Sequence, residues 1–397
     1  RDQALAAGEP ALLGERVYTS RLIGRDPDLV LHGGGNTSVK IGDIIHIKGS
    51  GWDLGDIESP GLPAVQLAPL LAARHGKKLS DPEMVKLLRD NLIDPAAPNP
   101  SVEALLHAYI PHTFVDHSHA SAILVLANQP NSRELCQEIY GDQVAWLPYV
   151  MPGYDLSIAA ADLYDQHPDC HGLFLENHGL FTFAADGKTA YERMIAFVSA
   201  AEAYLEKYGI SIEHVEPDPV KLPADLPGRL GQILREGDSP FADSLVLDPR
   251  CDDYLRAYTA LDTLDELSQR GTITPDHVIR TKPWPLVIDE HDNDDTLRKK
   301  LADYIERYRA YFARHAPNQT EEKIMLDPWP RLVLVRGKAA IGLGKTAKEA
   351  GIVADLAAQT AKVILAAETL GRYTPIREDR LFEMEYWSLE QAKLKKA

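Results

Sequence analysis

Two histidines stand two positions apart in the run Asp116-His117-Ser118-His119. Because side chains alternate along an extended strand, this spacing directs both imidazoles toward one face. Two imidazole nitrogens leave a tetrahedral metal site that needs a third ligand and an open position, as expected of catalytic zinc. His178 is the predicted third ligand, because it lies in a tight turn next to Gly179, on a hairpin expected in the same sheet. On spacing alone, two hydrogen-bonded histidines without a metal remain an alternative.

Three further motifs precede these histidines in the chain. They are Gly35-Asn36-Thr37-Ser38-Val39, Ile47-Lys48-Gly49-Ser50-Gly51 and Pro100-Ser101-Val102-Glu103. In this order, and with the three histidines, they resemble the class II aldolase/adducin family over residues 15–210. The whole chain looks still closer to the aldolase part of bifunctional rhamnulose-1-phosphate aldolase/short-chain dehydrogenase proteins, in segments such as 30–37, 274–278 and 386–390. In that branch a dehydrogenase domain normally follows, and we expect it either to begin after residue 397 or to be missing from this member.

The resemblance implies a role for each residue of the metal site. It implies that His117, His119 and His178 bind zinc, although Mn²⁺ or Co²⁺ also suits three neutral imidazoles. The metal of such aldolases polarises the substrate carbonyl as a Lewis acid. A glutamate at the position of Glu103 moves the proton and can ligate the metal when no substrate is bound. The alternative for Glu103 is an exposed residue in the first turn of a helix.

The motifs also predict a site for an acidic group. Glycines let the backbone approach an anion, and N–H groups at turns and helix starts supply partial positive charge. The resemblance places the residues that bind the substrate's phosphate or other acidic group at Gly35, Asn36, Ser50, Gly51 and Ser101.

The sequence departs from the aldolase pattern in two places. Val102 stands where phosphate-binding aldolases often carry a second serine before the glutamate. A second catalytic residue has no secure match, and Tyr149 and Glu138 are the two candidates. His107, one helical turn after Glu103, is a candidate supporting residue.

The activity implied by the resemblance is metal-dependent aldol cleavage. The substrate would be a sugar phosphate such as rhamnulose 1-phosphate, and the products dihydroxyacetone phosphate and an aldehyde. An epimerase or dehydratase on the same metal scaffold is one alternative, and a non-catalytic adducin-like interaction domain is another. Members of the family are commonly tetramers with the site at a subunit interface, so we expect a homo-oligomer.

The elements that must position these residues alternate between strands and helices. Apolar periodicity predicts helices over 10–24, 64–75, 82–93 and 101–110, strands over 37–41, 44–48 and 113–115, and a hairpin over 172–184. Thr189 and Glu192 predict a capping box at the start of a long helix that ends near Gly209. This order predicts an α/β fold. The resemblance to class II aldolases implies a central, mostly antiparallel sheet flanked by helices.

The composition shifts at 213–228, where four prolines stand among polar residues, so we predict a linker between a catalytic domain over 1–212 and a C-terminal α/β region over 229–397. The stretch 332–349 has the same order of strand, turn, strand and capped helix as 173–192. We interpret the C-terminal region as a degenerate repeat in which His178 has become Arg336. Chance similarity of two such units is the alternative.

The overall charge and cysteine content restrict the partners. A formal net charge of −17 argues against a nucleic-acid partner and against an anionic membrane surface. No continuous apolar run approaches the roughly 20 residues that span a bilayer. Three isolated cysteines fit a reducing compartment, and the first residues show no signal-peptide pattern. We therefore expect a cytoplasmic protein that binds its anionic substrate in a local pocket.

Overall fold

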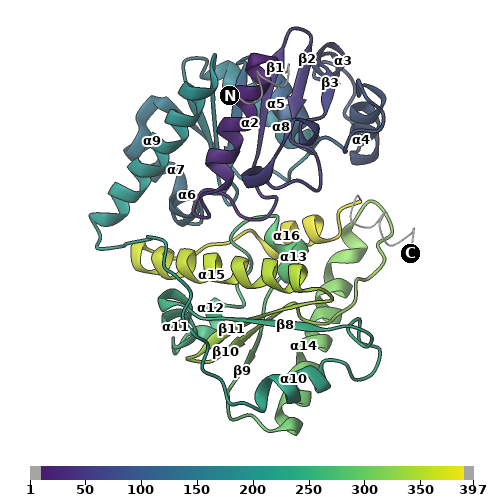
Figure 1. Ribbon diagram of the computed structural model, residues 1–397, viewed down its shortest axis with the longest axis vertical. Helices are drawn as coiled ribbons and strands as arrows, with labels where there is room; N and C mark the ends of the chain where they lie inside the picture. The colour runs from purple at the N-terminus through teal and green to yellow at the C-terminus, as the bar shows by residue number, and fades with distance from the viewer. Residues whose placement is uncertain (1–9, 389–397) are drawn as a thin grey trace. The chain divides into compact units, whose positions relative to one another are not determined.

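The structure is a computed structural model that describes residues 10–388 (Figure 1). The chain divides into two compact units, Arg1–Ser211 and Ile212–Ala397, which are described separately. Each unit contains one sheet. The predicted α/β fold with a second, C-terminal α/β region is confirmed.

The first unit is built on a seven-stranded sheet with the order β3-β2-β1-β4-β7-β6-β5. All neighbouring strands are antiparallel except β5 and β6, which are parallel. The strands are β1 (Asn36–Ile41), β2 (Ile44–Ile47), β3 (Ala64–Gln66), β4 (Phe114–Ser118), β5 (Val144–Leu147), β6 (Gly172–Leu175) and β7 (Gly179–Ala184). The predicted hairpin over 172–184 is therefore present as β6 and β7.

Helices cover both faces of this sheet. On one face α2 (Ala11–Gly24) packs on β1, and α9 (Gly187–Glu206) packs on β4 and β7. On the other face, apolar side chains of α5 (Ala104–Tyr109) and α8 (Tyr154–Gln166) share a core with those of β4, β6 and β7. The remaining helices are α3 (Leu67–Ala73), α4 (Asp81–Asp90), α6 (Ser121–Ala127) and α7 (Ser132–Tyr140).

Several predicted boundaries in this unit were wrong. The helix predicted over 101–110 begins only at Ala104, and the helix predicted over 82–93 ends at Asp90. Two further differences have a clear cause. The helix α9 begins at Gly187 rather than Thr189, because the side chain of Asp186 accepts the Thr189 N–H and is the N-cap. The segment 64–66 is the strand β3 rather than the start of a helix, since it pairs with β2. The predicted helix over 64–75 is thus reduced to α3.

The second unit has a four-stranded sheet with the order β8-β11-β10-β9. Its strands are β8 (Val246–Arg250), β9 (Leu286–Ile288), β10 (Leu332–Val335) and β11 (Ala339–Gly344). Its helices are α10 (Leu226–Ile233), α11 (Asp253–Thr259), α12 (Leu264–Leu267), α13 (His277–Thr281), α14 (Asp294–His315), α15 (Ala347–Leu370) and α16 (Glu378–Glu385). Residues 210–223 contain neither helix nor strand, but the predicted linker extends too far, because α10 begins at Leu226 with Pro227 in its first turn.

The helix α15 is the central helix of the second unit. By length and composition alone it could cross a membrane, yet 72% of its most apolar stretch is buried. It packs on β8 and β11 (Figure 1). Such burial is typical of a core helix.

Candidate metal centre

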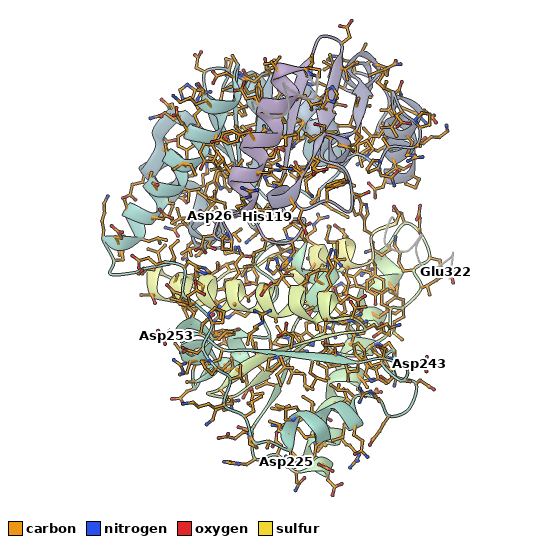
Figure 2. All side chains as sticks on the ribbon, in the orientation of Figure 1. Asp26, His119, Asp225, Asp243, Asp253 and Glu322 are labelled. Carbon is orange, nitrogen blue, oxygen red and sulfur yellow. The ribbon has the colours of Figure 1, made fainter. Side chains whose placement is uncertain are left out.

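Three histidine side chains converge on one face of the first sheet. His117 lies in β4, His119 follows the end of that strand, and His178 lies in the turn between β6 and β7 (His119 is labelled in Figure 2). All three are buried, and one nitrogen of each lies within 4.8 Å of the other two. The Nε2 atoms of His117 and His119 are 3.0 Å apart, close to the distance of about 3.3 Å between two nitrogens on a tetrahedral zinc ion.

The alternation of side chains along β4 explains why the His117 ring lies on this face of the sheet. The side chain of Asp116 forms an ion pair with Arg16 of α2, and the Ser118 hydroxyl donates to the sulfur of Met194 on α9. Both residues therefore face the helices α2 and α9. The intervening His117 faces the opposite side, where its ring stacks on Phe181 with a centroid distance of 4.0 Å.

The protonation of these imidazoles favours metal binding. The Nδ1 atom of His117 lies 3.1 Å from the backbone oxygen of Leu180. Since a carbonyl only accepts, Nδ1 carries the proton and the Nε2 lone pair is left for a metal. Burial, followed by the neighbouring histidines, holds the pKa of His117 and of His178 well below the usual value. Both rings are therefore neutral at pH 7, as metal ligands must be.

Two backbone features allow the three rings to approach. Asn177 adopts a positive φ of 53°, which turns the chain so that His178 points back toward β4. At Gly179 any Cβ would lie 2.3 Å from the Ser118 oxygen and 3.0 to 3.2 Å from the rings of His119 and His117. Glycine is therefore required where β7 passes the histidines.

Glu103 is the acidic group of this centre. It is buried at the N-cap of α5, and its two carboxylate oxygens each lie 3.6 Å from a histidine Nε2, one from His117 and the other from His178. The Asn36 side-chain amide donates to Glu103 Oε2 at 2.6 Å. The exposed alternative for Glu103 is thus excluded.

The residues predicted to bind the acidic group of the substrate lie in three adjoining segments. Asn36 begins β1 directly opposite His117, and Gly35 precedes it with φ +59° where a Cβ would lie 2.5 Å from the His117 oxygen. Ser50 and Gly51 form an exposed turn, and the Ser50 N–H donates to the Asn99 oxygen. The Ser101 N–H donates to the Lys48 oxygen, and the Ser101 hydroxyl accepts the Glu103 N–H. The turn at Ser50 is thus held by Asn99, and Ser101 is hydrogen-bonded directly to Glu103.

Several residues near the metal centre were not predicted from the sequence. Lys48 is buried, and its ammonium donates to the Gly33 oxygen, which links the first glycine loop to the second. Ser38 and Lys40 of β1 bond to α5. Alternation along β1 places both with Asn36 on one face, and this was the signal that could have found them.

The two candidates for a second catalytic residue have other contacts in the structure. The Glu138 carboxylate, on α7, accepts a hydrogen bond from the Tyr204 hydroxyl of α9. The backbone N–H of Tyr149 donates to Glu176. Neither contact joins these residues to the histidines.

A divalent metal fits this donor set. Three buried imidazoles and one carboxylate face one another, and within residues 10–388 no other group of three His, Cys, Asp or Glu residues is spaced to hold an ion. Three protein nitrogens also leave a coordination position for a substrate oxygen. Zinc, manganese and cobalt all accept imidazole ligands, so this geometry suits each of them.

Comparison with known proteins identifies the family of the chain. Residues 15–205 match the Class II Aldolase and Adducin N-terminal domain, and residues 225–394 match the Aldolase class II, second domain. The chain belongs to the class II aldolase/adducin family. The second unit of this family member accordingly corresponds to the second aldolase domain.

Individual relatives are similar over different lengths. An "uncharacterized oxidoreductase YuxG" from Bacillus subtilis is 30% identical over 99% of this family member, which spans only 60% of that relative's length. The N-terminal class II aldolase domain of a conserved Thermoplasma acidophilum protein is 42% identical, with a TM-score of 0.46, over 48% of this chain and 92% of that one. L-fuculose-1-phosphate aldolase from Thermus thermophilus is 18% identical, with a TM-score of 0.34, over 49% of this chain and 95% of that one.

Proposed function

We propose that this chain is a metal-dependent aldolase that cleaves a sugar phosphate, such as rhamnulose 1-phosphate, to dihydroxyacetone phosphate and an aldehyde. The observation that carries the proposal is the position of Glu103. Its carboxylate oxygens lie 3.6 Å from the ligand nitrogens of His117 and His178, so an acid–base group faces the metal centre directly. A binding module would not need a buried carboxylate beside three buried imidazoles, which favours an enzyme over an adducin-like interaction domain.

Two parts of the reaction have a group suited to them. A zinc ion held by the three histidines would supply Lewis-acid stabilisation of the negative charge on the substrate carbonyl oxygen. Cleavage removes a proton from the hydroxyl of the carbon that becomes the aldehyde, breaks the adjacent carbon–carbon bond and leaves a carbanion. Glu103 is assigned the proton delivered to that carbanion, because it is the carboxyl group beside the metal ligands. The hydroxyl proton passes to a base other than Glu103.

The acidic part of the substrate would bind at the glycine loops. The chain has a net charge of −17, so long-range attraction does not bring an anion to this site. The Gly33–Gly35 loop, the Gly51 N–H and the Ser50 and Ser101 hydroxyls are the local groups that we assign to the phosphate. The N–H groups of Gly34 and Ser50 are not among them, because they donate to the Leu31 and Asn99 oxygens. A cytoplasmic homo-oligomer with its substrate site near a subunit interface completes the proposal.

The test is an assay of rhamnulose 1-phosphate cleavage by the zinc-loaded protein and by its Glu103→Gln variant. Loss of the acid–base group predicts a decrease in kcat of roughly 10²- to 10⁴-fold, while elemental analysis shows unchanged zinc. A matched control is Glu192→Gln, which alters an exposed carboxylate of α9 paired with Lys188 and should leave kcat unchanged. Bound zinc without cleavage would instead favour an epimerase or dehydratase on the same scaffold, to be tested on pentulose phosphates and sugar acids.

A further inference from the structure

Three polar side chains of β1 point toward the short helix α5. Asn36, Ser38 and Lys40 alternate with Thr37 and Val39 along the strand, so the two sets face opposite sides of the sheet. The Thr37 hydroxyl lies 2.7 Å from the Ser20 hydroxyl of α2, on the other face of the sheet. Asn36, Ser38 and Lys40 therefore form a row along one face of β1, and each bonds to a group of α5 or of the segment that follows it.

His107 connects two members of this row. Its Nε2 atom lies within hydrogen-bond distance of Asn36 Oδ1, and its Nδ1 atom is 2.8 Å from the Ser38 hydroxyl. The orientation of Asn36 fixes the direction of these bonds, because its Nδ2 donates to Glu103 and its Oδ1 can only accept. His107 must therefore carry its proton on Nε2 and accept at Nδ1 from Ser38. The chain of donors runs from Ser38 to His107, then to Asn36, and ends on the Glu103 carboxylate.

The far end of α5 is tied to the same strand. The Lys40 ammonium donates to the backbone oxygens of His107, Ile110 and His112 at 2.7, 2.7 and 2.8 Å. These carbonyls lie at or just beyond the C-terminal end of the helix, where oxygens lack helical partners. Because Glu103 is the N-cap of α5 and His107 lies one turn later on the same side, both ends of the helix are fixed on β1.

We propose that His107 is a positioning residue for catalysis: with Ser38 it fixes the Asn36 amide so that the N–H, and not the oxygen, faces Glu103. This proposal rests on the proposed function, since it gives Glu103 the role of acid–base group. Without His107 the Asn36 amide can rotate by half a turn and present its oxygen to the carboxylate, which repels it. Glu103 then leaves the orientation that faces His117 and His178. Burial, with the nearby charges of Lys40 and Arg16, lowers the pKa of His107 well below the usual value, which agrees with a neutral ring.

The first experiment compares His107→Leu with His107→Gln in the zinc-loaded protein. Leucine removes both hydrogen bonds, whereas the glutamine amide nitrogen can occupy the place of Nε2 and donate to Asn36. We expect kcat to fall roughly 10- to 100-fold in His107→Leu, as for a misplaced catalytic group, with unchanged zinc content and little change in KM. His107→Gln should recover most of the loss. His112→Leu is the matched control, because its ring bonds Tyr164 instead.

Equal kcat losses in both His107 variants, or none in either, would overturn the proposal, and so would a loss that appears in KM or zinc content. A second measurement needs no activity and no variant. The ¹⁵N resonances of the histidine rings should show a neutral His107 with its proton on Nε2, whereas a proton on Nδ1 or on both nitrogens would contradict the donor chain. If the protein cleaves no sugar phosphate at all, the proposed function fails while this measurement still decides the hydrogen bonds.

Discussion

The two units share one strand arrangement but differ at the positions that bind a metal. The order β4-β7-β6-β5 of the first sheet recurs as β8-β11-β10-β9 in the second, with the same pairs antiparallel and the same pair parallel. The registers align His117 with Pro249, His119 with Cys251 and His178 with Lys338. The predicted correspondence of His178 with Arg336 was therefore wrong by two residues, because Gly337, with a positive φ, aligns with Asn177 rather than with Gly179.

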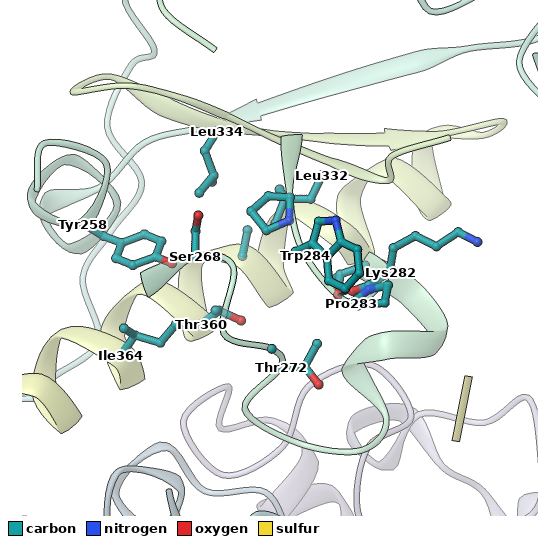
Figure 3. Close-up of a pocket in the computed structure, with 14 residues that line it drawn as sticks. Tyr258, Ser268, Thr272, Lys282, Pro283, Trp284, Leu332, Leu334, Thr360 and Ile364 are labelled. Atoms are coloured by element: carbon teal, nitrogen blue, oxygen red, sulfur yellow. Dashed lines mark hydrogen bonds between the residues drawn. The ribbon is translucent and has the colours of Figure 1, made fainter. Parts of the chain in front are cut away.

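The residues that replace the histidines in the second unit pack differently from the histidines of the first. Gly179 aligns with Ala339, so the second unit tolerates a Cβ where the first has none. Lys338 forms an ion pair with Glu290 at 3.1 Å instead of facing other ligands. A separate pocket of the second unit, between α15 and β10, is lined by hydroxyl, apolar and indole groups and by Lys282, without a His, Cys or carboxylate (Figure 3). One backbone plan thus holds three histidines in the first unit, whereas the aligned positions of the second unit hold Pro249, Cys251 and an ion-paired Lys338.

The largest expected effect comes from removing a ligand. His178→Ala should weaken zinc binding by more than about 100-fold, since even loss of an outer-shell partner costs about 10- to 100-fold. Lys338→Ala, at the aligned position, should leave zinc affinity unchanged. Competition with a chromophoric chelator measures both. Equal affinities in the two variants would break the comparison between the units.

A second effect concerns the buried ion pair that each unit contains. Arg16 pairs with Asp116 in the first unit, and Lys282 lies 3.5 Å from Glu385 in the second, with all four side chains buried. Asp116→Ala or Glu385→Ala leaves a buried cation without its partner, and should each lower the free energy of unfolding by about 3–5 kcal/mol. Urea denaturation measures this. Losses below 1 kcal/mol, as expected for an exposed pair such as Lys86–Asp90, would contradict it.

A smaller effect is expected at Gly179 and at Ala339, the residue aligned with it in the second unit. Gly179→Ala places a methyl group against the Ser118 backbone and should cost about 1–3 kcal/mol and weaken zinc binding. Ala339→Gly, the reverse change in the second unit, should cost about 0.5–1 kcal/mol with zinc affinity unchanged. Thermal unfolding with and without zinc separates the two. A Gly179→Ala variant with full zinc affinity would show that the close approach of β7 is not needed.

The smallest effect is pH-dependent and concerns the capping box of α4. Hydrogen bonds from Lys77 and Ser80 lower the pKa of Glu83 to about 2. A folded-state pKa below the unfolded value adds stability that is present above pH 4.5 and is lost as the pH falls toward 2. Glu83→Gln should therefore lower Tm slightly at pH 7 and have no effect near pH 2. A constant difference in Tm across this range would count against the role of the charge.

Short-range signals predicted the histidines and the hairpin, but not the partners that orient them. Alternation found His117 and His119, and the turn residues found His178. By contrast, Lys48, Ser38 and Lys40 act through partners 15 to 72 residues away. Alternation along β1 places Ser38 and Lys40 on the face of Asn36, but local spacing does not reveal which groups they bond. The start of α9 was misplaced because Asp186 and Thr189 both suit an N-cap, and only the geometry shows that Asp186 accepts the bond. The alignment of the two units required strand registers, since glycine occurs in both turns.

The central claim is that one metal ion is bound per chain, in the first unit and not in the second. Elemental analysis of the purified protein, after chelation and reloading with zinc and removal of the excess, tests it directly. The account predicts about one zinc per chain, lost in the His117→Ala variant and kept in Cys251→Ala. No bound zinc after reloading, or two per chain with one surviving His117→Ala, would contradict it.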